Sequence, residues 1–188
     1  MRIEIDLLHE NPLNAAIYGE DDLAQLAELV EKIKVSGYIK PLIINRNYMI
    51  LSGHRRYRAA KILGMRAIEI EMISKDENQE LEILLAENAF REKTTLQKVR
   101  EAEYYRSVEE KKAKERQLSG SNLPANLQEG ETNEIVGEKI GMSARSYHDA
   151  RKVVERIDEE EDPEVQEFLE ATVNTSVSAA SKLVEKPM

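Results

Sequence analysis

Three arginines close behind a glycine are the residues with the clearest chemical potential. Arg55, Arg56 and Arg58 follow Gly53, which itself follows a run of apolar residues. A glycine where a strand turns into a helix lets the backbone approach a ligand, and the first N–H groups of that helix point outward with the positive end of its dipole. Guanidinium groups add forked donors that suit phosphate oxygens. The segment therefore predicts an anion-binding site.

A solvated basic helix face is the alternative interpretation of this segment, and two observations count against it. The residues Ala59, Ala60, Ile62 and Leu63 give the helix an apolar side that is expected to pack against a core. The arginines also crowd into the first turn, where the helix dipole disfavours cations unless an anion compensates them.

A second group of polar residues, Glu87-Asn88-x-x-Arg91, ends a later helical segment. Carboxylate and amide oxygens are hard ligands for a magnesium ion that also touches a phosphate, and Arg91 offers a further phosphate donor. Taken alone, such a string on a charged helix is more often surface decoration. By themselves these residues are therefore weak evidence for a metal site.

A third group predicts a helix-turn-helix. Ile135, Val136 and Ile140 give a first helix an apolar side, and Gly141 makes the turn. The second helix is capped by Ser143 and offers donors for DNA phosphates and base edges. The candidate DNA-binding residues are Ser143, Arg145, Ser146, Tyr147, His148, Arg151 and Lys152. A generic helical hairpin is the alternative.

The elements that must position these groups differ between the two halves of the chain. Residues 1–95 mix strand-like and helix-like patterns, which predicts an α/β (α+β) domain with a small mixed sheet. We expect strands over 1–8, 41–45, 48–52 and 66–73, with helices over 23–36, 53–64 and 77–90. Gly37 is the expected C-cap of the first helix, and Ser74-x-x-Glu77 the capping box of the last.

The register changes from Thr94 onward. Thr94-x-x-Gln97 is a second capping box, which opens a long charged connecting helix over 96–117. Residues 118–133 lack periodicity and are rich in Ser, Gly, Asn and Pro, so they predict a flexible linker. Residues 134–188 are expected to form an all-α domain that holds the helix-turn-helix and then acidic C-terminal helices.

Composition excludes several classes of protein. The chain has 188 residues and no cysteine, so it has no disulfides, no thiolate metal site and no thiol nucleophile. It has no apolar run near the roughly 18 residues of a membrane helix and no signal-peptide pattern, which predicts a cytoplasmic protein without membrane contact. The net charge of −9 does not exclude DNA, because the last 31 residues carry 9 acidic and 2 basic groups.

Four motifs in this order resemble the ParB family of chromosome and plasmid partition proteins, part of the ParB/sulfiredoxin-like fold. The resemblance covers most of residues 1–157, and a helix-turn-helix follows in the family as it does here. The matching boxes are Leu8-x-x-Asn11-Pro12, the G-x-x-x-P segment at 37–42, the G-E-R-R-x-R-A-A box at 53–60, and Glu87-Asn88-x-x-Arg91.

The resemblance implies a nucleotide-binding domain that takes CTP, or another nucleoside triphosphate, with Mg²⁺. By position, Glu87 and Asn88 would serve the metal. The nucleotide would be contacted by Gly53, His54, Arg55, Arg56, Arg58, Lys40, Pro41 and Arg91. The implied partners are double-stranded DNA, a second copy of the chain in a homodimer, and a partition ATPase; the expected location is at the nucleoid or a plasmid.

Departures from the family pattern leave alternatives open. His54 stands where the family has Glu, which puts nucleotide identity and hydrolysis, as a slow CTPase, in question. The long helix before the helix-turn-helix and the short C-terminal part resemble plasmid and phage variants. The main alternative function is a ParB-like nuclease or phosphoryl-transfer enzyme that uses the arginine box with Glu87 and Asn88. A further alternative is an interaction module in which the box is structural.

Overall fold

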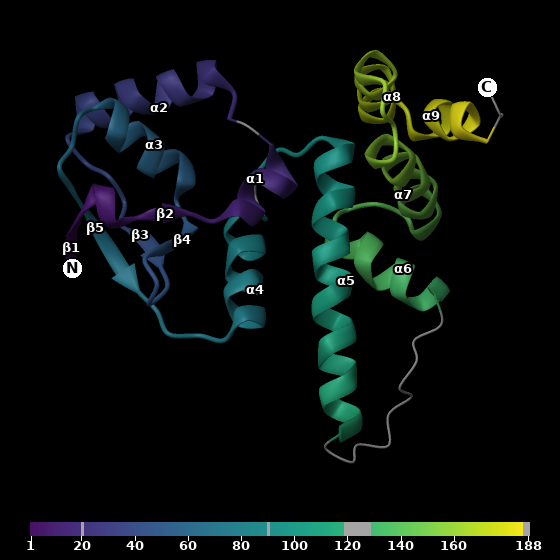
Figure 1. Cartoon of the computed structure of the whole chain (residues 1–188), viewed down its shortest axis with the longest axis horizontal. Helices are drawn as coiled ribbons and strands as arrows, with labels where there is room; N and C mark the ends of the chain where they lie inside the picture. The colour runs from purple at the N-terminus through teal and green to yellow at the C-terminus, as the bar shows by residue number, and fades with distance from the viewer. Residues whose placement is uncertain (20, 90, 119–128, 186–188) are drawn as a thin grey trace. The chain divides into compact units, whose positions relative to one another are not determined.

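Strands and helices are interspersed along the chain up to residue 91, and the elements that the structure describes after it are helices. The computed structural model describes residues 1–19, 21–89, 91–118 and 129–185. It divides into two units, Met1–Arg91 and Glu92–Met188, which are described separately (Figure 1).

The first unit is built around a five-stranded mixed sheet in the order β1-β5-β3-β4-β2. The β1–β5 and β3–β4 pairs are antiparallel, whereas β2–β4 and β3–β5 are parallel. The strands are β1 (Arg2–Glu4), β2 (His9–Glu10), β3 (Leu42–Ile44), β4 (Met49–Ser52) and β5 (Ala67–Met72). The predicted α+β class with a small mixed sheet is confirmed.

The hairpin of β3 and β4 forms where the sequence predicts it, and its turn is fixed by one side chain. The Oδ1 atom of Asn45 accepts hydrogen bonds from the backbone N–H groups of Asn47, at 2.9 Å, and Met49, at 3.0 Å. Leu42 and Ile44 lie on the same face of β3 and are fully buried, because this face of the strand packs in the core.

Four α-helices accompany the sheet: α1 (Pro12–Tyr18), α2 (Leu23–Ser36), α3 (His54–Ile62) and α4 (Glu77–Glu87). Gly37 ends α2 in the left-handed conformation (φ 65°), as predicted. The capping box at Ser74 is wrong, because Asp76 caps α4 by accepting from the N–H of Gln79 at 2.9 Å.

The segment around Asn11 also differs from the prediction. The expected strand over 1–8 is β1 followed by a 3-10 turn, Ile5–Leu7, and Asn11-Pro12 begins a helix rather than only ending a strand. Asn11 accepts from the N–H of Leu13 at 3.0 Å, and Pro12 occupies the first helical position, where its missing N–H costs nothing.

The buried apolar residues of this unit lie on both sides of α3. Tyr57 and Ala60 of α3 join the cluster beneath the sheet, which also contains Leu42, Ile44, Ile50, Ile68 and Ile70. Ala59 of α3 packs with Leu26, Val30 and Ile33 of α2. Of the apolar side predicted for the arginine-rich helix, Ala59 and Ala60 are fully buried and Leu63 is partly buried, whereas Ile62 is 62% exposed. The buried part is enough to fix where the polar side of α3 points.

The elements that the structure describes in the second unit are helices: α5 (Thr95–Leu118), α6 (Glu129–Lys139), α7 (Ala144–Asp158), α8 (Pro163–Thr175) and α9 (Val177–Val184). The predicted capping box at the start of α5 is confirmed, because Thr94 and Gln97 exchange hydrogen bonds of 3.1 and 3.3 Å. Helix α6 begins inside the segment expected as a linker, and residues 119–128 of that segment lie outside the described residues.

Helix α7 lies at the centre of the second unit and packs against α5, α6, α8 and α9 (Figure 1). Its apolar stripe, which includes Ala150, Val153 and Ile157, is fully buried. Gly141 makes the preceding turn in the left-handed conformation (φ 68°), and Ser143 caps α7 by accepting from the N–H of Ser146 at 3.1 Å. The helix, turn and helix thus lie where the sequence predicts them.

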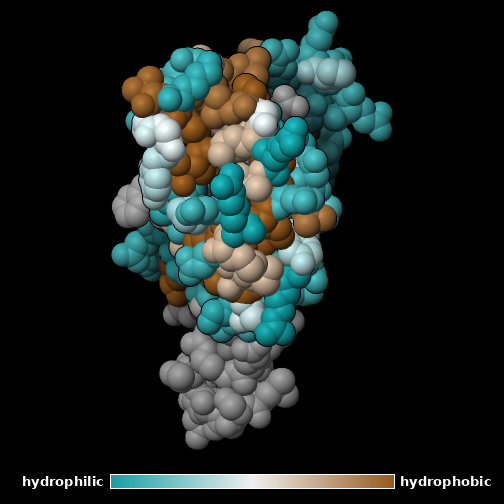
Figure 2. All heavy atoms as spheres, turned by 90° about the vertical axis from the view of Figure 1, so that its left-hand side faces the viewer, coloured by the Kyte–Doolittle hydropathy of each residue, from teal (hydrophilic) through white to brown (hydrophobic). Residues whose placement is uncertain are grey.

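Apolar and hydrophilic residues alternate over the face of the molecule drawn in Figure 2. Among the described residues, none of the helices combines the length and the apolar character needed to cross a membrane.

Candidate functional site

The turn from β4 into α3 requires a glycine on two grounds. Gly53 has φ 100°, a backbone conformation that residues other than glycine rarely adopt. A Cβ at this position would also lie 2.5 Å from Cδ2 of Leu42 and 2.9 Å from Cζ of Arg56. The close approach that the sequence predicts for Gly53 is therefore made to the protein's own Leu42 and Arg56.

Arg56 extends from this turn toward the segment before β3. Its Nη1 donates to the carbonyl oxygens of Lys40, at 2.7 Å, and Pro41, and its Nη2 donates to Oγ of Ser52 at 3.1 Å. Burial lowers the pKa of Arg56 below its usual value, while the nearby Glu87 carboxylate opposes that shift. The structure thus brings Lys40, Pro41 and Arg56 together, although they are far apart in sequence.

Helix α4 carries Glu87 to the same place. The hydroxyl of Ser52 donates to Oε2 of Glu87 at 2.6 Å. About two helical turns earlier in α4, Glu80 accepts a hydrogen bond of 2.9 Å from the side chain of Asn45. These two contacts dock α4 against the hairpin. Arg56, Ser52 and Glu87 therefore form one hydrogen-bonded chain between α3, β4 and α4.

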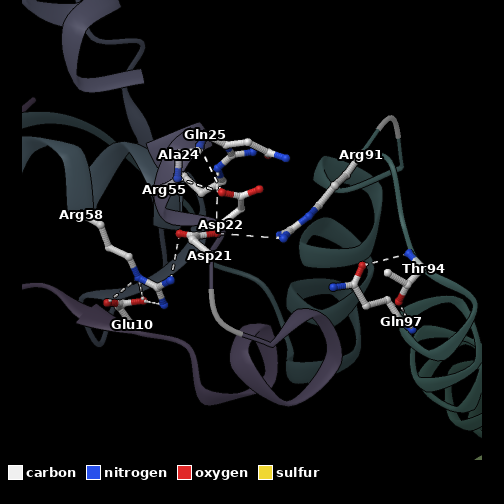
Figure 3. A network of polar contacts seen from close by, with 10 residues as sticks. All are labelled: Glu10, Asp21, Asp22, Ala24, Gln25, Arg55, Arg58, Arg91, Thr94 and Gln97. Atoms are coloured by element: carbon white, nitrogen blue, oxygen red, sulfur yellow. Dashed lines mark hydrogen bonds and ion pairs between the residues drawn. The ribbon is translucent and has the colours of Figure 1, made fainter. Parts of the chain in front are cut away.

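The other two arginines of the box point to a different side of α3. Arg55 and Arg58 converge with Arg91 on the carboxylate of Asp21, whose side chain is only 5% exposed (Figure 3). The distances from Asp21 are 2.8 Å to Nη1 of Arg58, 3.8 Å to Nε of Arg55 and 4.0 Å to Nη2 of Arg91. The predicted arginine box thus serves two adjacent clusters rather than one.

Arg58 has a second acidic partner. Its Nε donates to both carboxylate oxygens of Glu10, at 2.9 and 3.2 Å, and its Nη2 donates to one of them. The hydrogen bonds to Glu10 raise the pKa of Arg58 above its usual value. This fork-to-carboxylate pairing fixes the position of Arg58, and it leaves Arg55 and Arg91 as the more loosely held cations of the cluster.

The structure places His54, one of the predicted nucleotide contacts, in the interior of the first unit. It is 5% exposed, and its Nε2 accepts the backbone N–H of Asn11 at 3.2 Å. Burial lowers the pKa of His54 to about 4, so the ring is neutral near pH 7 and adds no positive charge. Its place in the box is therefore that of a link between α3 and the start of α1.

Glu87 and Asn88, the predicted metal ligands, are adjacent at the end of α4. The side-chain N–H₂ of Asn88 donates to the carbonyl of Leu84 at 2.8 Å, which directs its amide oxygen away from that carbonyl. Within the described residues, no three His, Asp or Glu side chains gather as a metal site. The two residues fit an ion that takes one carboxylate and one amide oxygen from the protein and the rest from phosphates and water.

The candidate DNA-binding residues of α7 separate into exposed and held side chains. Arg145 is 93% exposed, and Lys152, His148 and Ser143 also face solvent at least in part. Ser146 is half-buried and bonds to the hydroxyl of Ser143.

Tyr147 and Arg151 differ from the prediction that they offer free donors. Tyr147 is fully buried and donates to Glu103 at 2.8 Å, an arrangement in which burial raises the pKa of Tyr147 to about 12. Arg151 pairs with Glu103 and Glu155, each at 3.1 Å. Through Glu103, both side chains hold α7 against α5.

Sequence reasoning missed the acidic partners of the box. Asp21 and Glu10 are separated from Arg58 by 37 and 48 positions, so no local spacing pairs them. One signal existed for Asp21. Asp22 already caps α2, which left a second carboxylate beside the cap without a local role.

Comparisons with known proteins agree on the first unit. The model of the ParB N-terminal domain matches residues 1–89. The chromosome-partitioning protein ParB of Myxococcus xanthus is 29% identical over 123 residues, which are 63% of this chain and 40% of that protein. A probable chromosome-partitioning protein ParB of Campylobacter jejuni is 38% identical over 93 residues, 48% of this chain and 33% of that protein.

A solved structure of a pNOB8-like ParB-N domain has the same fold. It superimposes with a TM-score of 0.62 at 17% identity and covers 97% of this chain and 78% of its own. The chain spans less than half the length of the two curated relatives. With the motifs and the mixed sheet described above, residues 1–89 of this chain therefore form an N-terminal domain of the ParB family.

Proposed function

We propose that this chain binds CTP with Mg²⁺ at the start of α3 and binds double-stranded DNA with α7, in plasmid or chromosome partition or in transcription regulation. One observation carries the nucleotide part of the proposal. The turn at Gly53 gathers, from segments far apart in sequence, Arg56 with Lys40 and Pro41 on one side and Arg55 with Arg91 on the other.

The arginine cluster supports a ligand that carries several negative charges. Arg55 and Arg91 contact Asp21 at 3.8 and 4.0 Å, which are ion-pair distances but too long for hydrogen bonds. Their side chains remain 34% and 21% exposed, so phosphate oxygens can reach their donors. The oxygens of a triphosphate suit such forked donors.

Glu87 and Asn88 support a magnesium ion at the same site. Glu87 is exposed and accepts from Ser52 through Oε2, and no described residue donates to the Oδ1 of Asn88. A magnesium ion commonly takes one or two protein oxygens and completes its shell with phosphate oxygens and water. It would neutralise phosphate charge beside Glu87.

The exposed face of α7 supports the DNA part of the proposal. Arg145 and Lys152 offer cations to phosphates, and a capped helix with solvated polar side chains is of the kind that enters a major groove. The names of the relatives, chromosome-partitioning proteins, agree with this assignment.

A homodimer and a partition ATPase are further partners that the family resemblance suggests. Sedimentation with and without CTP measures the first, and co-sedimentation with a partition ATPase measures the second. Release of inorganic phosphate from CTP measures turnover. The nuclease alternative has less support, because a two-metal site needs several carboxylates and the described residues offer no group of three.

Calorimetry with the four nucleoside triphosphates and Mg²⁺ tests the nucleotide proposal. We expect CTP to bind best and Arg55→Ala to weaken that binding by at least about tenfold, because a charge-assisted contact to phosphate is lost. Arg46→Ala is the matched control, since Arg46 lies exposed in the hairpin turn. Equal binding by both variants and the wild type, or no heat with any triphosphate, would refute the proposal.

A further inference from the structure

We infer that Asp21 is a built-in counter-anion that a ligand's phosphate must displace, and that it selects polyphosphates over monophosphates. The inference deepens the proposed function and rests on it. No local sequence motif assigns Asp21 to the site, and its carboxylate lies at the centre of three guanidinium groups (Figure 3).

The position of Asp21 is that of a bound anion. Its side chain is 5% exposed, and its two oxygens face Arg58 on one side and Arg55 and Arg91 on the other. Three cations this close together repel one another unless an anion lies between them. In the folded chain Asp21 supplies that anion.

The distances favour an Asp21 carboxylate that a ligand can displace over one that permanently holds the arginines in place. Arg58 is fixed by Glu10 through several hydrogen bonds and does not need Asp21 to hold its position. Arg55 and Arg91 have only the long contacts to Asp21 and make no hydrogen bond with it. Arg91 is steadied instead by the ring of Tyr18, whose centroid lies 5.2 Å from its Cζ. Replacing one carboxylate by phosphate oxygens would thus cost few hydrogen bonds.

The charge of a ligand then determines whether it can displace Asp21 from the arginines. Three arginines face two carboxylates, Asp21 and Glu10, so the cluster keeps about one uncompensated positive charge. A monophosphate carries roughly 1.5 to 2 negative charges and gains little over the carboxylate that it displaces. A triphosphate brings more charge and more acceptor oxygens, so it competes better.

Asp21→Asn with Asp22→Asn as its control tests the inference. Both variants remove one negative charge from neighbouring positions. Asp22 caps α2 through Oδ1, at 2.8 Å from the N–H of Ala24, and asparagine caps equally well. We expect D21N to bind CMP about tenfold more tightly than wild type, with a smaller gain for CTP, so that the preference for CTP over CMP falls. D22N should resemble wild type.

If D21N weakens the binding of either nucleotide, Asp21 is a scaffold and the inference is overturned. Equal affinities in D21N and D22N overturn it too, while tight CTP binding by the wild type would leave the proposed function intact.

Thermal melting with inorganic pyrophosphate, without Mg²⁺ or base, gives an independent measurement. D21N should melt lower than wild type in the absence of anions, because three cations lose a partner, and pyrophosphate should raise its melting temperature more than that of D22N. This measurement tests the displacement of Asp21 separately from the binding of a nucleotide. A D21N protein that pyrophosphate does not stabilise beyond D22N would overturn it.

Discussion

Two helices in this chain begin after a glycine turn and carry cations in their first turns, yet they hold those cations in opposite ways. At the start of α3 the arginines are partly buried and paired, with Arg58 bonded to Glu10 and Asp21. At the start of α7 Arg145 is 93% exposed and only 3.9 Å from Asp149.

The difference follows from what each helix must recognise. A small anion needs donors fixed in advance, since ordering long side chains on binding costs free energy. A DNA backbone is a long array of charges, and mobile cations on a helix face contact it without fixed geometry. The first cluster therefore depends on the fold around it, and the second depends mainly on its charge.

The two turn glycines give the largest expected contrast. Gly53→Ala should lower the free energy of unfolding by about 3–5 kcal/mol, because it adds strain at positive φ to an overlap with Leu42. Gly141→Ala meets nothing within 4 Å and should cost only about 1–2 kcal/mol, the price of a left-handed backbone. Urea unfolding of the two variants measures both values. Equal losses would show that the turn at Gly53 is no tighter than that at Gly141.

Acid should next distinguish the buried histidine of α3 from the exposed one of α7. The pKa of His54 is about 4 in the folded chain and has an ordinary value near 6.5 in the unfolded chain. Between these values the unfolded state binds more protons, so the stabilisation is complete above about pH 6.5 and is lost as the pH falls toward 4. The expected loss is about 3 kcal/mol.

Chemical unfolding at a series of pH values measures this loss. His54→Gln should remove about that much of the decline between pH 6.5 and 4, because the new side chain does not titrate. His148→Gln is the control, since the side chain of His148 is 43% exposed. If both variants decline as steeply as the wild type, the burial of His54 does not control its protonation.

Local signals predicted most of the elements but not how their side chains face. Gly37, Ser143 and the Thr94–Gln97 box act on backbone within a few residues, so their effect can be derived from sequence. The same reasoning missed α1, although an asparagine followed by proline is a helix start as well as a strand end.

The sequence predicted the arginines of the site but not the acidic residues that pair with them. Gly53 and the arginines stand in one segment, whereas Asp21 and Glu10 reach them only through the fold. The burial of Tyr147 was available from periodicity, because it shares a helical stripe with Ala150, Val154 and Ile157. Its hydroxyl suggested a DNA contact, whereas in the structure that hydroxyl donates to Glu103.

The two faces of α7 give the smallest expected effects on stability and the sharpest separation of roles. Lys152→Ala should leave the free energy of unfolding nearly unchanged, since the residue is exposed, and should reduce the salt dependence of binding to a mixed-sequence DNA duplex by about one phosphate contact. Tyr147→Phe should do the reverse. It removes the hydrogen bond to Glu103 and should lower the free energy of unfolding by about 1–2 kcal/mol, with DNA affinity at 25 °C retained.

Fluorescence titrations at several salt concentrations, together with urea unfolding, measure both variants of α7. If the two helices differ as we propose, the charged residues of α7 determine DNA affinity and its packed residues determine stability. At α3, by contrast, the same arginines are paired within the fold and contact the ligand. If Tyr147→Phe weakened DNA binding as much as Lys152→Ala, recognition by α7 would depend on fixed geometry as well. The two basic helices would then work in the same way.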